Sequence, residues 1–305
     1  MAFYLIILGI LVLTILCVSV MVVKLIRQPA EPLSLSQYCK LAVSGVIAFI
    51  ADTLGVGSFA VNIALARLMG TFRDDEMPAV NNGAQVIPGT IESLFFMTVI
   101  NVDMTTLLTL VAGTSLGGLI GGFVASRLGK QAIRFAMMCA FTLIIFLLIA
   151  HQFHLLPVGG EVTALYSWKL VIAFFALMIC GVLTSVGVGL FVMVQGVLFL
   201  MNISPEIAFP IMTTAGAMQQ PLTTLAFLQQ DKIPLKKTMV LSLAGILGVL
   251  MILPVFKYLT VTWLHTLLLL ILVYNLVSVT RSYFRARPGK KYTQAPSSGS
   301  LVAAE

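Results

Sequence analysis

Two stretches of the sequence place glycines and polar side chains in the middle of long apolar segments. The first is ADTLGVGSFAVN, at 51–62, and the second is TSVGVGLFVMVQ, at 184–195. Glycine allows tight turns and the close approach of a ligand. A helix that restarts after such a turn presents free N–H groups and a partial positive charge. Because this combination suits a small oxyanion, the sequence predicts an anion site at the two Gly-Val-Gly turns.

Amide and hydroxyl side chains accompany both turns and the helices that follow them. Such groups can bind an oxyanion without burying a full countercharge, although each could instead only cap a broken helix or tie it to a neighbour. The predicted substrate-binding residues are Gly55, Gly57, Ser58, Phe59, Asn62, Asn81, Asn82, Gln85, Thr184, Ser185, Gly187, Gly189, Leu190, Gln195, Thr213, Thr214, Gln219 and Gln220.

Asp52 is the acidic residue nearest to the first turn. An ionised acid beside an anion site would repel the substrate, so we expect Asp52 to bind a proton and to couple transport to protons. The alternative is that it only caps the second arm of the broken helix. Glu92 lies further along the next helix, where it would either extend a proton path or pair locally.

The overall composition is that of an integral membrane protein. Hydrophobic residues make up 59% of the 305-residue chain and charged residues only 10%, against about 25% charged residues in soluble domains. Lysines and arginines beside membrane spans explain the net charge of +7. The lipid bilayer is therefore an expected partner, and nucleic acid is not.

Residues that hold metals or perform catalysis show no typical pattern. Cys17, Cys39, Cys139 and Cys180 are single residues in or beside apolar segments, and no cysteine accompanies the His151/His154 pair. The HExxH signature is absent from the sequence. We therefore expect no metal, no cofactor and no enzymatic activity.

Segment lengths indicate seven membrane crossings and two broken segments. Seven apolar segments have about the twenty residues that a crossing requires. The segments 37–70 and 168–203 would form helices of about 50 Å, against a hydrocarbon core of about 30 Å, and each has Gly-x-Gly near its centre. The nine segments are 3–26, 37–70, 79–100, 104–126, 132–152, 168–203, 206–229, 238–256 and 261–280.

The placement of basic residues favours hairpins over single crossings for the two long segments. If both fold back at their glycines and the N-terminus is outside, only Lys169 and Lys257 of the 18 lysines and arginines lie outside. Nine full crossings would place Lys257 and five arginines or lysines of 67–134 outside. Because basic residues favour the cytoplasmic side, re-entrant hairpins are predicted.

The two long segments also form an internal repeat. At an offset of 132 residues (187 − 55), AFIADTLGVGSFAVNIALARLMG at 48–70 aligns without a gap with CGVLTSVGVGLFVMVQGVLFLMN at 180–202. The register continues to Pro78 and Pro210, each expected in the first turn of the next helix. Because each hairpin is followed by three crossings, an odd number, the two repeats are inverted relative to each other.

The predicted fold is therefore an all-α integral membrane protein with two inverted repeats, each a re-entrant helical hairpin plus three transmembrane helices. One extra N-terminal transmembrane helix precedes them. We expect this helix and a linker at 1–35, the first repeat at 36–155 with its tip at 55–58, the second at 167–281 with its tip at 187–190, and a disordered cytoplasmic tail at 282–305. The cell (inner) membrane is the expected location, and a homo-oligomer is left open.

Two further stretches are expected to have structural roles only. GTSLGGLIGGF, at 113–123, lacks the Gly-Lys-Ser/Thr of a phosphate loop. Its small residues, spaced three and four apart, are typical of a helix packing face. The acidic run DDE, at 74–76, is expected to form a solvated turn at the start of a helix.

The two glycine-rich breaks, the second within CGVLTSVGVGLF, and the proline that leads the helix after each break are similar to the sulfite exporter TauE/SafE (TSUP) family. The resemblance covers roughly 40–280. Ser58 and Leu190 stand where that family has a third glycine, and no proline follows inside either arm. The resemblance implies a carrier for a small sulfur-containing anion such as sulfite, a sulfonate or thiosulfate.

The expected function is therefore secondary transport of a small anion by alternating access, with proton coupling at Asp52. The alternatives are a passive anion channel, or a membrane-embedded accessory protein or enzyme of sulfur or envelope metabolism.

Overall fold

The computed structural model describes residues 2–27, 32–153, 160–254 and 262–285, which form eleven helices and no β-strand. The predicted all-α class is confirmed, and the helices are those of a helical membrane protein. The tail beyond Arg285, predicted to be disordered, lies outside the described residues, as does His154.

The helices follow the predicted apolar segments closely. Each of the two long segments consists of two helices, α2 with α3 and α7 with α8, separated by a Gly-Val-Gly turn. The helices are α1 (Ala2–Arg27), α2 (Leu35–Thr53), α3 (Ser58–Met69), α4 (Met77–Val99), α5 (Met104–Ala125), α6 (Lys130–Gln152), α7 (Ser167–Thr184), α8 (Leu190–Leu200), α9 (Pro205–Gln229), α10 (Leu235–Ile252) and α11 (Thr262–Arg285).

Local capping residues set several helix ends. At the start of α5, the Asp103 carboxylate accepts a hydrogen bond from the Thr106 N–H at 2.7 Å. Pro78 lies in the first turn of α4 as predicted. The equivalent prediction for Pro210 is wrong, because Ser204 caps α9 and Pro205 occupies its first turn. Pro210 therefore lies inside the helix, more than one turn from its start.

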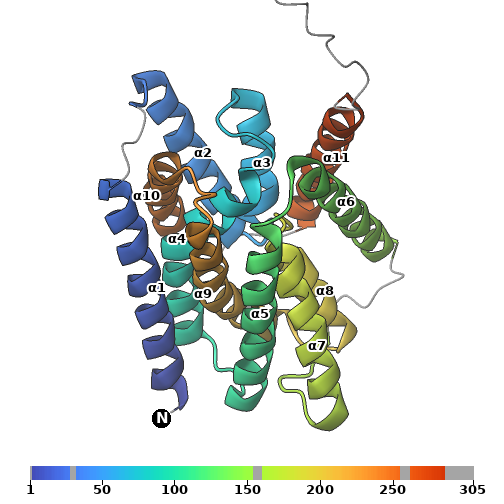
Figure 1. The fold of residues 1–305 in the computed structure, drawn as a ribbon. Helices are drawn as coiled ribbons and strands as arrows, with labels where there is room; N and C mark the ends of the chain where they lie inside the picture. Colours follow the sequence, from blue (N-terminus) through green and yellow to red (C-terminus); the bar gives the residue numbers. More distant parts are fainter. Residues whose placement is uncertain (1, 28–31, 154–159, 255–261, 286–305) are drawn as a thin grey trace, which may run out of the picture.

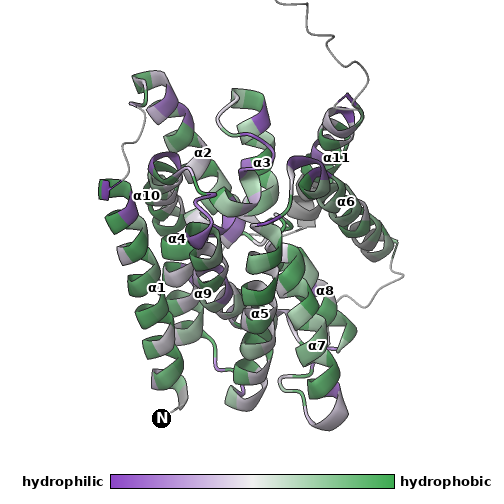
Figure 2. Cartoon of the chain, viewed as in Figure 1, coloured by the Kyte–Doolittle hydropathy of each residue, from purple (hydrophilic) through white to green (hydrophobic). Residues whose placement is uncertain are grey.

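Hydrophobic residues make up most of the helices, and hydrophilic residues gather near the middle of the bundle and at helix ends (Figure 2). Four of the described helices, α1, α5, α7 and α10, are long and apolar enough to cross a membrane. Leu8 and Leu247 are 57% and 59% exposed, whereas Asn82 and Gln219 are completely buried. Because water would favour the reverse distribution, the outer surface is suited to lipid.

The two helix pairs that flank the Gly-Val-Gly turns lie at opposite ends of the molecule. In Figure 1, α2 and α3 lie in the upper part and α7 and α8 in the lower part. Helix α2 packs on α10 and α7 packs on α5, while α4 and α9 pack against each other between them. Helix α1 lies at the edge of the bundle, in contact with α4 and α9.

Glycines on one face of α5 allow the close approach of α7. Cβ atoms added at Gly113 and Gly121 would lie 2.5 Å from the Phe174 carbonyl oxygen and 2.7 Å from the Val182 Cα. At Gly117, an added Cβ would overlap the Met178 carbonyl. The prediction that 113–123 forms a packing face is therefore confirmed, and the close contact fixes α7 beside α5.

Substituting Gly117 with alanine tests this contact. We expect Gly117→Ala to lower the free energy of unfolding by about 1–3 kcal/mol, because the backbone of α7 must move away. The control is Gly196→Ala on α8, where an added Cβ meets no atom within 4 Å. Denaturant titration of both variants in detergent measures the difference, and equal stability of the two would contradict the packing described here.

Candidate functional site

The first helix break lies at Leu54–Gly57, between α2 and α3. Gly55 and Gly57 have φ angles of 86° and 90°, in the left-handed region that favours glycine. The N–H groups of Gly55 and Val56 donate to the carbonyls of Asp52 and Ala51, at 2.8 and 2.9 Å. The N–H groups of these two residues are therefore hydrogen-bonded to the end of α2. Helix α3 then begins at Ser58.

Asp52 caps the helix that follows the first break. Its Oδ1 accepts a hydrogen bond from the Ser58 N–H at 2.5 Å, and its Oδ2 accepts one from the Gln85 amide. The Ser58 hydroxyl donates to Gln85 Oε1 at 2.6 Å. The expectation that the Ser58 N–H is free for a substrate is therefore wrong, because a carboxylate of the protein already occupies the start of α3.

The second break, between α7 and α8, lacks such a cap. Gly187 has a φ angle of 98°. Helix α8 begins at Leu190 after the N-cap residue Gly189, and within the described residues no side chain is hydrogen-bonded to its first N–H groups. Thr184 occupies the position equivalent to Asp52 in the repeat alignment, but its hydroxyl donates to the Cys180 carbonyl at 2.8 Å instead. The start of α8 consequently keeps its partial positive charge and its donors.

The two breaks lie close to each other and to the helix after the opposite break. A Cβ added at Gly189 would lie 3.9 Å from the Phe59 Cβ, at the start of α3. Gly55 lies beside the Phe209 ring of α9, and Gly187 beside Pro78 of α4. The predicted residues of the two turns, which lie far apart in the sequence, therefore meet in the interior.

Buried amides of α4 and α9 continue the polar interior around the breaks. The Asn82 amide donates to the Pro78 and Thr184 carbonyls at 2.8 and 3.3 Å. The Gln219 amide donates to Thr223 Oγ1 at 2.6 Å and to Asn82 Oδ1 at 3.4 Å. These bonds connect α4, α7 and α9 beneath the second break.

Several of the predicted residues instead hold helices together. Ser185 donates to the Gly118 carbonyl of α5 at 3.1 Å, and Thr213 donates to the Phe209 carbonyl of its own helix. Thr214 accepts a hydrogen bond from Ser93 at 3.1 Å. Gln195 is only partly buried on α8. The hydrogen bonds of Ser185, Thr213 and Thr214 are therefore made to other groups of the protein.

Three predicted amides keep an oxygen that has no hydrogen-bond partner in the described structure. They are fully or almost fully buried, and the unpartnered atoms are Asn62 Oδ1, Gln219 Oε1 and Gln220 Oε1. Asn62 donates through its nitrogen to Asn81 Oδ1 at 2.5 Å. An amide can exchange its oxygen and nitrogen by a half-turn, so these side chains can meet either a donor or an acceptor of a ligand.

Sequence reasoning missed Ser93 and Thr223, which belong to the same buried network. Thr223 follows Gln219 by four residues on α9 and donates to the Gly118 carbonyl at 2.9 Å. Ser93 lies on the face of α4 that also carries Gln85 and Gly89. The spacing of three and four residues was the signal that could have identified them, because it places side chains on one helix face.

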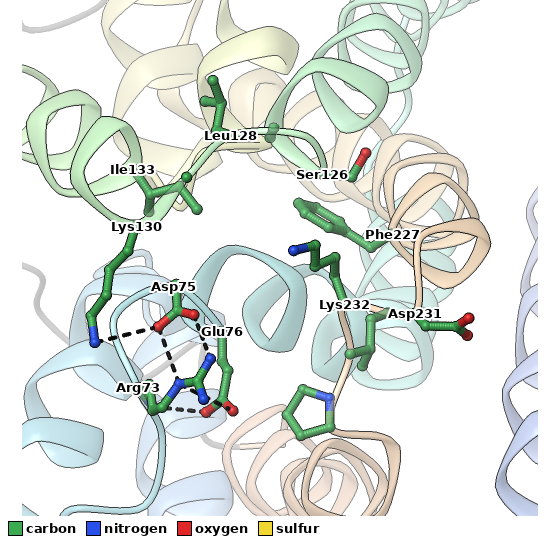
Figure 3. Close-up of a pocket in the computed structure, with 14 residues that line it drawn as sticks. Arg73, Asp75, Glu76, Ser126, Leu128, Lys130, Ile133, Phe227, Asp231 and Lys232 are labelled. Carbon is green, nitrogen blue, oxygen red and sulfur yellow. Dashed lines mark hydrogen bonds and ion pairs between the residues drawn. The ribbon is translucent and has the colours of Figure 1, made fainter. Parts of the chain in front are cut away.

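A cavity of 420 Å³ opens at the end of the molecule that carries most of the charge. It is lined by the α3–α4 loop, the start of α6 and the α9–α10 loop. Figure 3 shows the Lys232 side chain pointing into this cavity. Asp75 there pairs with Arg73 at 2.6 Å and with Lys130 at 3.8 Å. Lys232 itself forms no ion pair within the described part of the chain, so it is an unpaired cation in this cavity.

A buried ion triad lies beside this cavity. Asp74 pairs with Arg67 at 3.1 Å and with Arg134 at 2.7 Å, and the three side chains are only 9–11% exposed. Arg67 also donates to the Asn275 carbonyl of α11 at 2.9 Å. The prediction that the acidic run 74–76 is solvated is therefore wrong for Asp74, which ties α3 to α6 and, through Arg67, to α11.

Comparison with protein-family models and with curated proteins gave no match to this chain. The functional argument consequently rests on the geometry of the site and on its sequence motifs.

Replacing Asp74 tests the buried triad. We expect Asp74→Asn to lower the free energy of unfolding by about 3–5 kcal/mol, since two buried guanidinium groups lose their shared counterion. The neighbouring Asp75→Asn removes a more exposed pair and should change it by no more than about 1 kcal/mol. Denaturant titration in detergent compares the two variants, and a milder effect at Asp74 than at Asp75 would overturn the assignment.

Proposed function

We propose that the protein is a secondary transporter for a small anion, which binds at the uncapped start of α8 beside the first break. The observation that carries the proposal is the difference between the two breaks. Asp52 occupies the start of α3, whereas within the described residues no side chain is hydrogen-bonded to the start of α8, which follows Gly189. A buried helix start with free donors attracts an oxyanion, and an unpaired backbone group in a membrane interior costs several kcal/mol.

Alternating access would follow from two inverted repeats that move relative to each other. The packing of the helices supports this part of the proposal. In the proposed repeat, α2, α3, α4, α5 and α6 of the first half correspond in order to α7, α8, α9, α10 and α11 of the second. The contact α2–α10 then corresponds to α7–α5, and α4–α10 corresponds to α9–α5. All four of these contacts are present. The contacts α4–α9 and α6–α11 exchange into themselves. Broken helices that meet between such repeats are the usual binding sites of secondary transporters.

The positions of basic residues support the proposed hairpins. Lys24, at the end of α1, pairs with Asp231 at 2.7 Å, and Asp231 and Lys232 line the same cavity as Arg73 and Lys130. Nine full crossings would require Lys24 and Arg73 to lie on opposite sides of the membrane. With hairpins, these residues all lie on one side, which the proposal makes the cytoplasmic side.

For the substrate we propose a sulfur-containing oxyanion such as sulfite, a sulfonate or thiosulfate. The support is the resemblance of both Gly-Val-Gly breaks to the TauE/SafE family, together with the amides and hydroxyls around the start of α8. The unpaired cation of Lys232 in the cavity would raise the local concentration of such anions. This site differs from the family pattern at two positions. Ser58 and Leu190 have side chains where the family has a third glycine.

Substituting Gly189 tests the position of the proposed site. Its φ angle of −59° suits any residue, so Gly189→Leu should fold while its side chain fills the space at the start of α8. We expect at least about a tenfold loss of anion uptake into proteoliposomes, equivalent to 1.4 kcal/mol or more. Gly196→Leu on the same helix, where an added Cβ meets no atom within 4 Å, is the control and should retain uptake.

The same vesicles distinguish a carrier from a passive channel. Sulfite, thiosulfate and taurine are supplied outside, with and without unlabelled anion inside. A carrier exchanges labelled for unlabelled anion and is accelerated by the anion inside, whereas flux through a channel is not. Uptake that Gly189→Leu leaves intact would contradict the proposed site, and the absence of exchange for every anion tested would contradict transport.

A further inference from the structure

Two carboxyl groups face each other in the interior, next to the first break. Asp52 and Glu92 are 1% and 0% exposed, and they lie close enough to interact directly. Within the described residues, neither carboxyl forms an ion pair. Two negative charges 4 Å apart repel each other by about 4 kcal/mol even at an effective dielectric constant of 20, and burial adds several kcal/mol for each ion.

No cation in the neighbouring helices offsets this repulsion. Helix α4, which carries Glu92, packs on α1, α3, α9 and α10. From α1 and α9, the hydroxyls of Thr14 and Thr214 bond to Thr90 and Ser93 of α4. The charged side chains of these four helices lie near the helix ends, at Lys24, Arg27, Arg67, Glu206, Lys236 and Lys237. The pair must therefore hold a proton to remain buried.

The hydrogen bonds identify Asp52 as the ionised member. Both of its oxygens accept hydrogen bonds, one from the Ser58 N–H and one from the Gln85 amide. The Ser58 hydroxyl binds Gln85 Oε1 and so turns the Gln85 nitrogen towards Asp52. A carboxylate with donors on both oxygens at a helix start is stabilised as the ion.

Glu92 receives fewer hydrogen bonds than Asp52. Its Oε1 accepts a hydrogen bond from the Thr53 hydroxyl, and its Oε2 has no partner in the described part of the chain. Thr53 Oγ1 also lies 3.1 Å from the Phe49 carbonyl, which can only accept. Because the Thr53 hydroxyl has a single hydrogen for these two acceptors, Glu92 has at most one donor where Asp52 has two, and its ionised form is the less stabilised of the pair.

We infer that Glu92, rather than Asp52, carries the proton that accompanies the anion through the membrane. The inference rests on the proposed function and names its coupling ion. While Glu92 is neutral, Asp52 is the one negative charge of the pair. When Glu92 releases its proton to water on the side of the membrane where the anion leaves, it becomes a second negative charge. Because the second charge repels the substrate, the anion and one proton bind together and leave together, which is symport.

Glu92→Gln tests the inference, because glutamine keeps the size and hydrogen-bonding capacity of the neutral acid but cannot release a proton. In proteoliposomes we expect this variant to exchange labelled anion while losing accumulation driven by a pH gradient and the proton uptake seen with a pH-sensitive dye. Glu206→Gln, an exposed acid in the first turn of α9, is the matched control and should retain both. Accumulation that survives in Glu92→Gln would overturn the inference.

A second measurement does not depend on transport. Infrared spectroscopy of the purified protein should show the C=O band of a protonated carboxyl that is absent in Glu92→Gln and present in Asp52→Asn. A band that disappears in Asp52→Asn and persists in Glu92→Gln would assign the proton to Asp52 and overturn the inference. If the wild-type protein exchanges no anion, the proposed function fails, and the band still decides which acid holds the proton.

Discussion

A helix that breaks inside an apolar bundle must find partners for the backbone groups that it leaves unpaired, and the rest of this structure depends on that constraint. In water such groups would bind solvent, whereas in a membrane each one costs several kcal/mol unless protein or ligand satisfies it. The first break meets the requirement with Asp52, whose carboxylate binds the Ser58 N–H. That solution introduces a buried charge, and the neighbouring acid Glu92 then has to be neutral.

The second break follows a different course at the same position of the repeat. Thr184 stands where the first break has Asp52, and its hydroxyl turns back to the Cys180 carbonyl. The start of α8 is thus open to a ligand that brings negative charge. One break is completed by the protein and the other is proposed to be completed by its substrate, and the approach of Gly189 to Phe59 brings the two within the reach of one small anion.

Much of the fold could be predicted from the sequence, because apolar length and glycine placement determine where a membrane chain is helical. The predicted segments 79–100 and 104–126 differ from α4 and α5 by no more than two residues at either end. Contacts between distant residues could not be predicted, since no local pattern marks Asp74 as the partner of Arg134. The predicted segment 206–229 begins one residue from the start of α9, but Pro210 was wrongly expected in the first turn, because Ser204 and Pro205 begin the helix.

The candidate site was predictable in its location and only partly in its chemistry. Both Gly-Val-Gly turns were visible as glycines in segments too long for one crossing. The difference in capping between the two turns was less visible in the sequence. Asp52 lies six residues before Ser58, and its carboxylate reaches the Ser58 N–H only because the turn between them reverses the chain direction. Proton coupling was expected at Asp52, but the two donors that bind the oxygens of Asp52 move the proposal to the other acid, Glu92.

Locating a bound anion tests the central claim most directly. A heavy oxyanion of the same shape, such as selenite or selenate, can be soaked into the purified protein and found by its anomalous scattering. The account predicts a peak at the first N–H groups of α8, between Leu190 and Phe59. A peak confined to the cavity around Lys232, or at the start of α3 in place of the Asp52 carboxylate, would contradict it.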